Sequence, residues 1–455
     1  MRAAVYTAAW VLPATAAPIA RGAVLVNEHG RIAAVAPAEA VPAGDDVARI
    51  ELGEAILLPG LINVHAHPEL TAMRGALEDL PFHLWVPALR RLKDRAAFTP
   101  ADYGVAARWT CVEAIAAGVT TMAATEESGA AVEAFRECGL RGIVYYELSS
   151  PIAAEAAEVL TRLRPRLDAA RRLETDRIRI GISPHAPYTV SDELYRLTAD
   201  FATTEQLPVA AHIAESEVES LLVEQGSGPF AAGLRTRGIA TPARARTPIA
   251  LLHDTGMLAT RPLLIHCVHT SADDIRAITD AGAAVAHCPT ANARLGHGVA
   301  PAVELLEAGV TVGLGTDSVA ANNRIDLLEE ARTAQLLQRA RLRTAAALPP
   351  ERLLRLITID AARALGMDTH IGSLEVGKDA DMCAVRVTAP HVRPMVDPVA
   401  ALVLSARGSD VVLTLVAGQV LYRGGQHQTL GPDALRDRID ELGGRLRAAR
   451  RDTYA

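Results

Sequence analysis

The sequence predicts an α/β protein in which a (β/α)8 TIM-like barrel is inserted into a small β-sandwich domain built from both chain ends. Strand-like runs occupy both ends of the 455-residue chain, whereas the middle alternates apolar runs with helix-like stretches. That alternation is typical of a barrel of parallel strands. A chain of this length is also too long to fold around one simple hydrophobic core, so we expect a large domain and a smaller one.

The two ends of the chain are expected to form the small domain. Residues 1–58 read as short strands with turns, including GAVLVNE and HGRIAAVAP. Residues 372–424 have the same character in GSLEVGKDADMCAVRV and VVLTLVAGQVLYRGG. We therefore predict a β-sandwich made of residues 1–58 and 368–430. A charged amphipathic helix is expected over 431–455.

The barrel is predicted over residues 59–367. Its candidate strands are nearly continuous apolar runs, as expected for strands that are buried on both faces. In chain order they are LINVHAH, GVTTMAAT, RGIVYYEL, IRIGISPHAP, PVAAHIAES, PLLIHCVH, AAVAHCPTAN and TVGLGTDS. Helix-like stretches such as TPADYGVAARWTCVEAIAAG and SADDIRAITDAG lie between them. Eight strands that alternate with helices favour a (β/α)8 barrel.

The composition limits the classes of function. The net charge of −7 argues against a nucleic-acid-binding surface, which needs a basic excess. The sequence has no apolar run long enough to cross a bilayer. The first residues, MRAAVYTAAWVLPATAAPIA, superficially resemble a signal peptide, but strand–turn–strand character follows at once, so we interpret them as a first strand. The five cysteines are dispersed without motif spacing, which favours reduced thiols and a cytoplasmic location.

Potential metal ligands lie at the carboxyl ends of the predicted strands. They are His65 and His67 on the first strand, His185 on the fourth, His212 on the fifth, His266 and His269 on the sixth, His287 on the seventh and Asp317 on the eighth. Barrel enzymes place their chemistry at this end, so these residues would converge. A single histidine here is more often structural. The combination of the HxH motif with His212 and Asp317 instead favours a divalent metal such as zinc, with an open position for water.

Glu215, three residues after His212, is the candidate proton carrier. An attacking water needs a nearby carboxylate that accepts its proton and passes it to the leaving group. The alternative is a surface glutamate that is stabilised at the start of a helix. His266 is expected to polarise the water or the developing oxyanion. Because strand neighbours alternate, His269 should face away and be structural.

Several motifs along the chain carry a family resemblance. They are PGLINVHAHPELTAMRGALEDLPFHLWV, SPHAPYTVS, HIAES, HCVH, AHCPTANARLGHGVAPAVELLEAGVTVGLGTDSVAANN and IGSLEVGKDADMCAV. Together they resemble the amidohydrolase superfamily, in the branch of the methylthioadenosine/S-adenosylhomocysteine deaminases and related chlorohydrolases. The resemblance covers essentially the whole chain. It implies a β-sandwich plus barrel, one divalent metal ion, and hydrolytic loss of an amino group from a purine-like ring.

The resemblance also implies roles for individual residues. The metal ligands would be His65, His67, His212 and Asp317, holding Zn2+ or else Fe2+. Glu215 would shuttle protons with the help of His266, and Asp317 would also accept a proton from the attacking water. His185 would contact the substrate. Trp85 would line the pocket, although ordinary core packing is an equal alternative for this residue.

Two positions depart from that branch. The branch has a glutamate that grips the ribose hydroxyls somewhat beyond the tryptophan, but VPALRRLKDR offers only Asp94 there, and Glu69 replaces an apolar residue after HAH. The motifs GLRGIVYYELSSP, AHCPTANARLG and GLGTDSVA are closer to the aminodeoxyfutalosine deaminases, which act on an adenine nucleoside carrying a benzoate. Arg74, Arg90 and Arg294 are the candidates for binding that carboxylate.

We therefore expect a metal-dependent aminohydrolase of an adenine-type nucleoside: aminodeoxyfutalosine, methylthioadenosine, S-adenosylhomocysteine or adenosine. One alternative is hydrolysis of another ring, such as guanine, a triazine or a halogenated heterocycle. Another is a catalytically silent barrel, against which the intact set of candidate residues argues. A homodimer or larger homo-oligomer is compatible with the sequence, and no nucleic-acid or membrane partner is expected.

Overall fold

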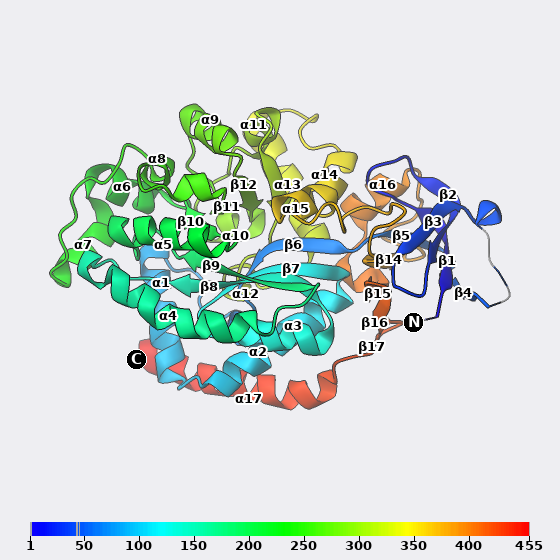
Figure 1. The fold of residues 1–455 in the computed structure, drawn as a ribbon, viewed down its shortest axis with the longest axis horizontal. Coiled ribbons are helices and arrows are strands. Elements are labelled where there is room, and N and C mark those ends of the chain that lie inside the picture. Colours follow the sequence, from blue (N-terminus) through cyan, green and yellow to red (C-terminus); the bar gives the residue numbers. More distant parts are fainter. Residues whose placement is uncertain (1, 42–43, 45, 455) are drawn as a thin grey trace.

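The computed structural model describes residues 2–41, 44 and 46–454. It is an α/β structure with one sheet made from both ends of the chain and two parallel sheets made from the middle (Figure 1). None of the helices within these described residues is long and apolar enough to span a membrane. The five cysteines are all free and buried, as their scattered spacing predicted.

Strands from both ends of the chain pair in one sheet. They are β1 (Ala4–Val11), β2 (Ile19–Val26), β3 (Ile32–Pro37), β4 (Ala48–Glu51), β5 (Ala55–Pro59), β14 (Met382–Arg386), β15 (Val411–Val416), β16 (Gln419–Arg423) and β17 (Gln426–His427). Their hydrogen-bonded order is β17-β16-β15-β14-β5-β1-β2-β3, with β4 beside β1. The antiparallel pair β5–β14, in which Leu58 faces Cys383, joins the N-terminal strands to the C-terminal ones.

The middle of the chain contains one strand in each predicted apolar run. These strands are β6 (Leu61–Ala66), β7 (Val119–Glu126), β8 (Arg141–Leu148), β9 (Ile178–Pro184), β10 (Ala210–Ile213), β11 (Leu263–His266), β12 (Ala284–His287) and β13 (Thr311–Leu314). They form two four-stranded parallel sheets, β6-β7-β8-β9 and β10-β11-β12-β13. The sheets meet at both edges: Ile182 bridges Val209, and the Asp317 amide donates to the His65 carbonyl at 2.9 Å.

Helices lie between these strands and beyond them. The α-helices are α1 (Phe82–Arg95), α2 (Pro100–Ala116), α3 (Ala130–Cys138), α4 (Ala156–Arg171), α5 (Asp192–Glu205), α6 (Glu217–Gln225), α7 (Gly228–Thr236), α8 (Pro248–Asp254), α9 (Ala272–Ala281), α10 (Pro289–Arg294), α11 (Ala302–Glu307), α12 (Val319–Asn322), α13 (Leu327–Leu342), α14 (Pro350–Leu356), α15 (Ile359–Ala364), α16 (Pro398–Ala400) and α17 (Pro432–Tyr454). Shorter helical turns are η1 (Ala38–Ala40), η2 (Pro68–Met73), η3 (Ala153–Glu155), η4 (Met257–Thr260), η5 (Ala401–Ser405) and η6 (Gly408–Asp410).

Local sequence explains where several helices begin. Thr99 accepts a hydrogen bond from the Asp102 amide and so caps α2, and Ser271 caps α9 through Asp274 in the same way. Both are capping boxes, which satisfy amides that the first helical turn leaves unpaired. The last helix, α17, lies along α2 in Figure 1, and its Arg445 donates to the Asp102 carboxylate at 2.9 Å.

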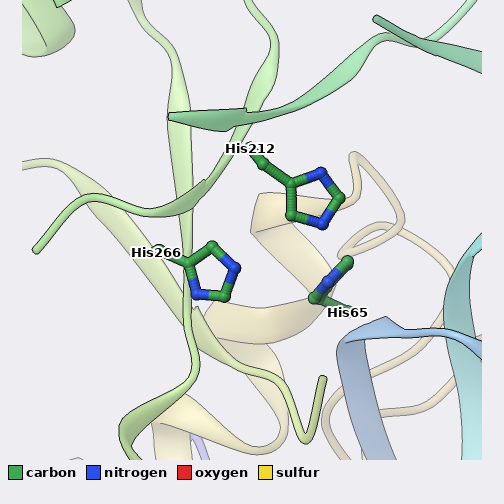
Figure 2. Close-up of side chains that lie close together, drawn as sticks. All are labelled: His65, His212 and His266. Atoms are coloured by element: carbon green, nitrogen blue, oxygen red, sulfur yellow. The ribbon is translucent and has the colours of Figure 1, made fainter. Parts of the chain in front are cut away.

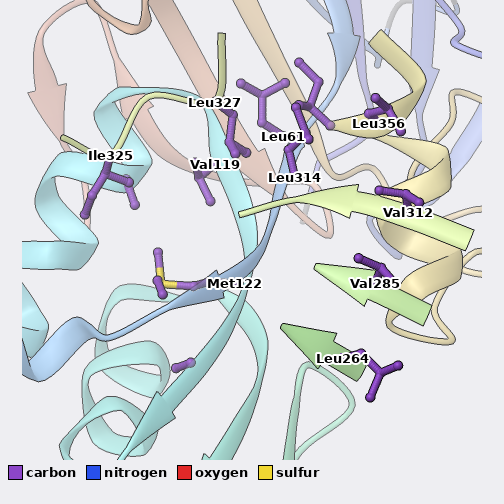
Figure 3. Packing of buried hydrophobic residues seen from close by; sticks show 14 of the residues in the cluster. Leu61, Val119, Met122, Leu264, Val285, Val312, Leu314, Ile325, Leu327 and Leu356 are labelled. Atoms are coloured by element: carbon purple, nitrogen blue, oxygen red, sulfur yellow. The ribbon is translucent and has the colours of Figure 1, made fainter. Parts of the chain in front are cut away.

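Apolar side chains from the parallel strands and from the helices share one core. Figure 3 shows side chains of β6, β7, β11, β12 and β13 packed with residues of α13 and α14. The labelled members are Leu61, Val119, Met122, Leu264, Val285, Val312, Leu314, Ile325, Leu327 and Leu356. This packing fixes the strands relative to one another, so the polar residues that follow them are held at one end of the sheets.

A buried ion pair ties β8 to the segment that leads into β14. Arg141 donates its Nε to Asp381 Oδ2 at 2.8 Å and its Nη2 to Asp379 Oδ2 at 2.8 Å. Arg141 and Asp381 are 4% and 3% exposed, so solvent screens their attraction little. The parallel sheet and the terminal sheet are therefore linked by charge as well as by chain connectivity.

Arg141→Met is expected to lower the free energy of unfolding by about 3–5 kcal/mol, because it leaves the Asp381 carboxylate buried without its cation. Urea unfolding followed by circular dichroism measures the loss. Arg31→Met is the matched control, since Arg31 is half exposed and its guanidinium lies 3.8 Å from Asp379. Exposed pairs of this kind contribute at most about 1 kcal/mol. Equal losses in the two variants would refute a special role for the buried pair.

Candidate active site and metal centre

The ends of three strands bring four candidate metal ligands together. His67 Nε2 lies 3.3 Å from His212 Nε2. Asp317 Oδ1 lies 3.3 Å from His65 Nε2 and 3.5 Å from His67 Nε2. The trios His65–His67–Asp317 and His65–His212–His266 each have ligand atoms close enough to hold one metal ion. In Figure 2 the rings of His65, His212 and His266 surround a common space.

Neighbouring groups determine which ring nitrogens are free to bind an ion. His212 Nδ1 lies 3.2 Å from the carbonyl oxygen of His185, so this nitrogen donates and Nε2 keeps its lone pair. His65 Nδ1 lies 3.4 Å from Thr125 Oγ1, whereas His65 Nε2 is buried and has no hydrogen-bond partner among the described residues. Metal-binding histidines usually have their second nitrogen held in this way. The buried Nε2 of His65, left without a partner, therefore fits a metal ligand.

Burial sets the charge state of these histidines. It lowers the pKa of His65 and of His67 well below the ordinary value. It lowers the pKa of His212 to about 3 and the pKa of His185 to about 4. The imidazoles are therefore neutral at pH 7, which is the form that binds a metal. Neutral imidazoles together with the Asp317 carboxylate form a donor set that suits zinc or a similar divalent ion.

Glu215 lies in the turn after β10 and faces two histidines. Its Oε1 is 3.2 Å from His297 Nε2 and 3.5 Å from His266 Nε2. Glu219 holds this turn by accepting the amide of Ala214 at 2.7 Å and the amide of Glu215 at 3.1 Å. Burial raises the pKa of Glu215, which brings it closer to the pH at which a carboxyl group can both accept and donate a proton.

His266 is oriented from behind by an amide side chain. Its Nδ1 lies 2.9 Å from Asn292 Oδ1, so Nδ1 donates and Nε2 points toward Glu215. His266 and Asp317 have left-handed backbone angles, with φ of 78° and 59°, which are strained for residues with a side chain. His269 behaves differently, because its Nε2 bonds the carbonyl of His297 at 3.0 Å. Among the described residues that line the neighbouring cavity, His266 is present and His269 is not.

A cavity opens beside these groups, and both expected substrate contacts line it. Trp85 is 7% exposed, and its buried Nε1 has no hydrogen-bond partner in the part of the chain that the structure describes. His185 Nδ1 lies 2.7 Å from Thr189 Oγ1, which leaves Nε2 on the side of Glu147, 3.9 Å away. Phe82 and Tyr188 add aromatic rings to the wall. The cavity is thus suited to a ligand with a flat ring bordered by polar groups.

The structure sorts the remaining charged candidates. Arg74 is paired with Glu113 and Arg294 with Glu78, and neither arginine is among the described residues that line the cavity, so their role in binding a substrate carboxylate stays a prediction. Arg90 does line it. Asp94 is exposed and is likewise outside the described lining, so the structure does not favour it as a replacement for the missing ribose-binding glutamate. Glu69 lines the cavity, but it is buried and accepts the amide of Ser128 at 3.0 Å.

Sequence reasoning missed His297, Asn292, Glu147 and Glu219. His297 and Asn292 lie after β12, in α10 and the loop beyond it, where a search of strand ends does not look. Glu147 lies at a strand end, so the same search extended to acidic residues would have found it. His287 also ends a strand, but no described residue hydrogen-bonds either of its buried ring nitrogens, and it is not among the described cavity residues.

Curated relatives of this chain are nucleoside deaminases by name. The 5-methylthioadenosine/S-adenosylhomocysteine deaminase of Syntrophobacter fumaroxidans is 34% identical over 425 residues, which cover 90% of this chain and 90% of that protein. The 5'-deoxyadenosine deaminase of Methanothermobacter thermautotrophicus is 33% identical over 426 residues, covering 90% and 92%. Similarity at this level therefore extends over about nine-tenths of the chain.

A solved structure and a family description point in the same direction. An adenosine deaminase from Xanthomonas campestris with bound zinc superposes with a TM-score of 0.84 at 27% identity, covering 98% of each chain. The Amidohydrolase family matches residues 56–421. This family is metal-dependent, and together with the deaminase names of the relatives it indicates a hydrolase acting on C–N bonds. The chain therefore belongs to the Amidohydrolase family.

Proposed function

We propose that this chain removes the 6-amino group of an adenine-type nucleoside as ammonia, in a metal-dependent hydrolysis. The observation that carries the proposal is the convergence of His65, His67, His212 and Asp317 beside a buried glutamate, Glu215, at the end of a cavity. The names of the two curated relatives and of the adenosine deaminase structure described above supply the class of substrate.

The proposal includes the finer architecture. The two parallel sheets would form one closed (β/α)8 barrel over residues 59–367, supported by the contacts at both of their edges. The terminal sheet would be a β-sandwich domain of residues 1–58 and 368–430, followed by the helix of residues 431–455. Closure would explain why residues that follow β6 and β13 lie as close together as residues of neighbouring strands.

The metal would be held by His65, His67, His212 and Asp317, as Zn2+ or else Fe2+. When bound, a divalent ion of this kind supplies a water acidic enough to attack at neutral pH. His67 Nε2 and His212 Nε2 lie 3.3 Å apart, and the His212 nitrogen keeps its lone pair, which supports this assignment.

Protons would move through the buried groups around Glu215. The attacking water adds its oxygen to C6 of the ring, and Glu215 takes a proton from it and delivers it to the ring nitrogen N1. Glu215 then passes the second proton to the departing amine, the C6–N bond breaks, ammonia leaves, and a carbonyl remains at C6. His266, oriented by Asn292, would stabilise the developing negative charge. Asp317 would orient the water and accept a proton from it.

The cavity also supports a preference within the nucleosides. Arg90 lines it and is close enough to His185 that its charge, second to burial, lowers the pKa of that histidine. A cation at this position suits a substrate whose 5′ substituent ends in a carboxylate, as the benzoate of aminodeoxyfutalosine does. We therefore place aminodeoxyfutalosine among the best substrates, together with methylthioadenosine, S-adenosylhomocysteine and adenosine.

A panel of substrates tests the proposal. With ammonia release as the assay, kcat/KM for the adenine nucleosides should exceed that for guanine by about 100-fold, because a poorly matched ring leaves buried polar groups unpaired. Arg90→Ala should lower the ratio of kcat/KM for aminodeoxyfutalosine to that for adenosine by about tenfold. Arg74→Ala, which removes an arginine held by Glu113, is the matched control. If guanine or a triazine is hydrolysed fastest, the nucleoside assignment fails.

A further inference from the structure

One carboxylate in the cavity wall has a buried oxygen that accepts no hydrogen bond from the described residues. The carboxylates of the lining are Glu69, Glu127, Glu147, Glu215 and Asp317. Glu69 accepts the Ser128 amide at 3.0 Å and Asp317 accepts the Ser318 amide at 2.6 Å, whereas Glu127 lies 3.6 Å from Lys93 Nζ and Glu215 lies 3.2 Å from His297 Nε2. Glu147 is the exception, because its Oε1 is buried and accepts no hydrogen bond from any described residue.

The strand register directs Glu147 toward the cavity. Tyr146 and Leu148, its neighbours on β8, pack into the core cluster that also contains Leu61 and Val119. Tyr145 packs into a different cluster, together with Trp85. Since alternate residues of a strand share a face, Glu147 lies on the Tyr145 side, next to the candidate site. A buried acceptor that stays unpaired is costly, and its usual explanation is a ligand.

A second metal ion does not account for this carboxylate. Glu147, His185 and His212 have ligand atoms within 4.8 Å of one another, and the Glu147 Oε1 is 3.9 Å from His185 Nε2 and from His212 Nδ1. However, His212 Nδ1 lies 3.2 Å from the His185 carbonyl, to which it donates its proton. A neutral ring whose Nε2 faces His67 has no second lone pair to offer at Nδ1. The trio therefore provides at most two ligands.

The helix α1 does not supply the acid that a ribose needs. Along this side of the cavity it presents Arg90 and Lys93, whereas Asp94 is exposed and outside the described lining. Vicinal hydroxyl groups are donors, and a cationic wall cannot accept their hydrogen bonds. The unpaired acceptor of Glu147 lies beside His185. It keeps an acceptor oxygen whether or not the carboxyl group is protonated.

We propose that Glu147 recognises the sugar of the substrate by accepting hydrogen bonds from the 2′- and 3′-hydroxyls of its ribose. This inference rests on the proposed nucleoside deamination and assigns a specificity-determining residue to the same site. It places the sugar against the end of β8 rather than against α1. It also predicts that the site distinguishes ribonucleosides from their deoxy analogues through one side chain.

The test compares kcat/KM for adenosine and for 2′,3′-dideoxyadenosine in the wild type, Glu147→Ala and Glu147→Gln. The wild type should prefer adenosine by about tenfold, the size expected for the loss of two ordinary hydrogen bonds. Glu147→Ala should lose most of that preference, chiefly through a higher KM for adenosine. Glu147→Gln keeps one acceptor oxygen and should retain part of it. Should the alanine variant not fold, the near-isosteric glutamine variant carries the comparison.

Glu127→Gln is the matched control. It removes a carboxylate charge from the same cavity lining, but this carboxylate is already paired with Lys93. It should keep the wild-type preference for adenosine. The inference is overturned if Glu147→Ala keeps the full preference for adenosine. It is also overturned if this variant loses its metal and added metal restores both the metal content and the preference. Failure of the proposed function gives a different result, in which the wild type releases ammonia from neither nucleoside.

Discussion

Glu215→Gln is expected to keep the metal and the fold while kcat falls by about 10²–10⁴-fold. The amide has nearly the same shape as the carboxylate and can still contact His297, which lies 3.2 Å from Oε1. It cannot take a proton from water or return one to the leaving amine. Ammonia release at saturating substrate measures kcat, and elemental analysis of the same preparation measures the metal.

Glu217→Gln separates catalysis from a helix-capping role. Glu217 is exposed in the first turn of α6, two residues after Glu215, so it has the same favourable position near a helix N-terminus. If Glu215 served only to stabilise the N-terminus of the helix, the two glutamine variants would have the same activity. Turnover close to that of the wild type in Glu215→Gln would therefore remove this residue from the mechanism.

The positions of the strands could be predicted from the sequence because parallel strands are buried on both faces. Runs such as IRIGISP and RGIVYYEL are apolar at almost every position, as burial on both faces requires, and each contains a strand. Pairing of the two chain ends also followed, since isolated short strands at either end would leave unpaired edges. The two-residue strand β17 is too short to have a pattern of its own.

The candidate site was accessible where chemistry and strand ends coincide. His65 and His212 lie near the carboxyl ends of β6 and β10, and Asp317 comes shortly after β13, so a one-dimensional pattern indicates that they converge. His297 reaches Glu215 from the loop after α10, and only the folded structure decides where that loop lies. The directions of long side chains are also set by distant partners, as for Arg74 and its acceptor Glu113.

Loss of the metal is expected to have the largest effect on activity. Dialysis against a chelator should abolish ammonia release, and added Zn2+ should restore it, with about one ion bound per chain. His212→Ala removes a ligand atom that lies 3.3 Å from His67 Nε2. Since even outer-shell partners of a metal are worth about 10–100-fold, loss of a ligand should lower occupancy or activity by at least about 100-fold. Asp317→Ala should do the same.

His287→Gln is the control for these ligand variants. His287 also ends a strand and is buried, but its ring nitrogens contact no hydrogen-bond partner within the described structure, and it is not among the described residues of the cavity wall. It should keep the metal content of the wild type. The proposed metal site would be contradicted if protein with less than about one-tenth of an ion per chain kept full turnover. The neutral imidazoles of His65, His67 and His212 would then need another explanation, because burial without a cation leaves their lone pairs unpaired.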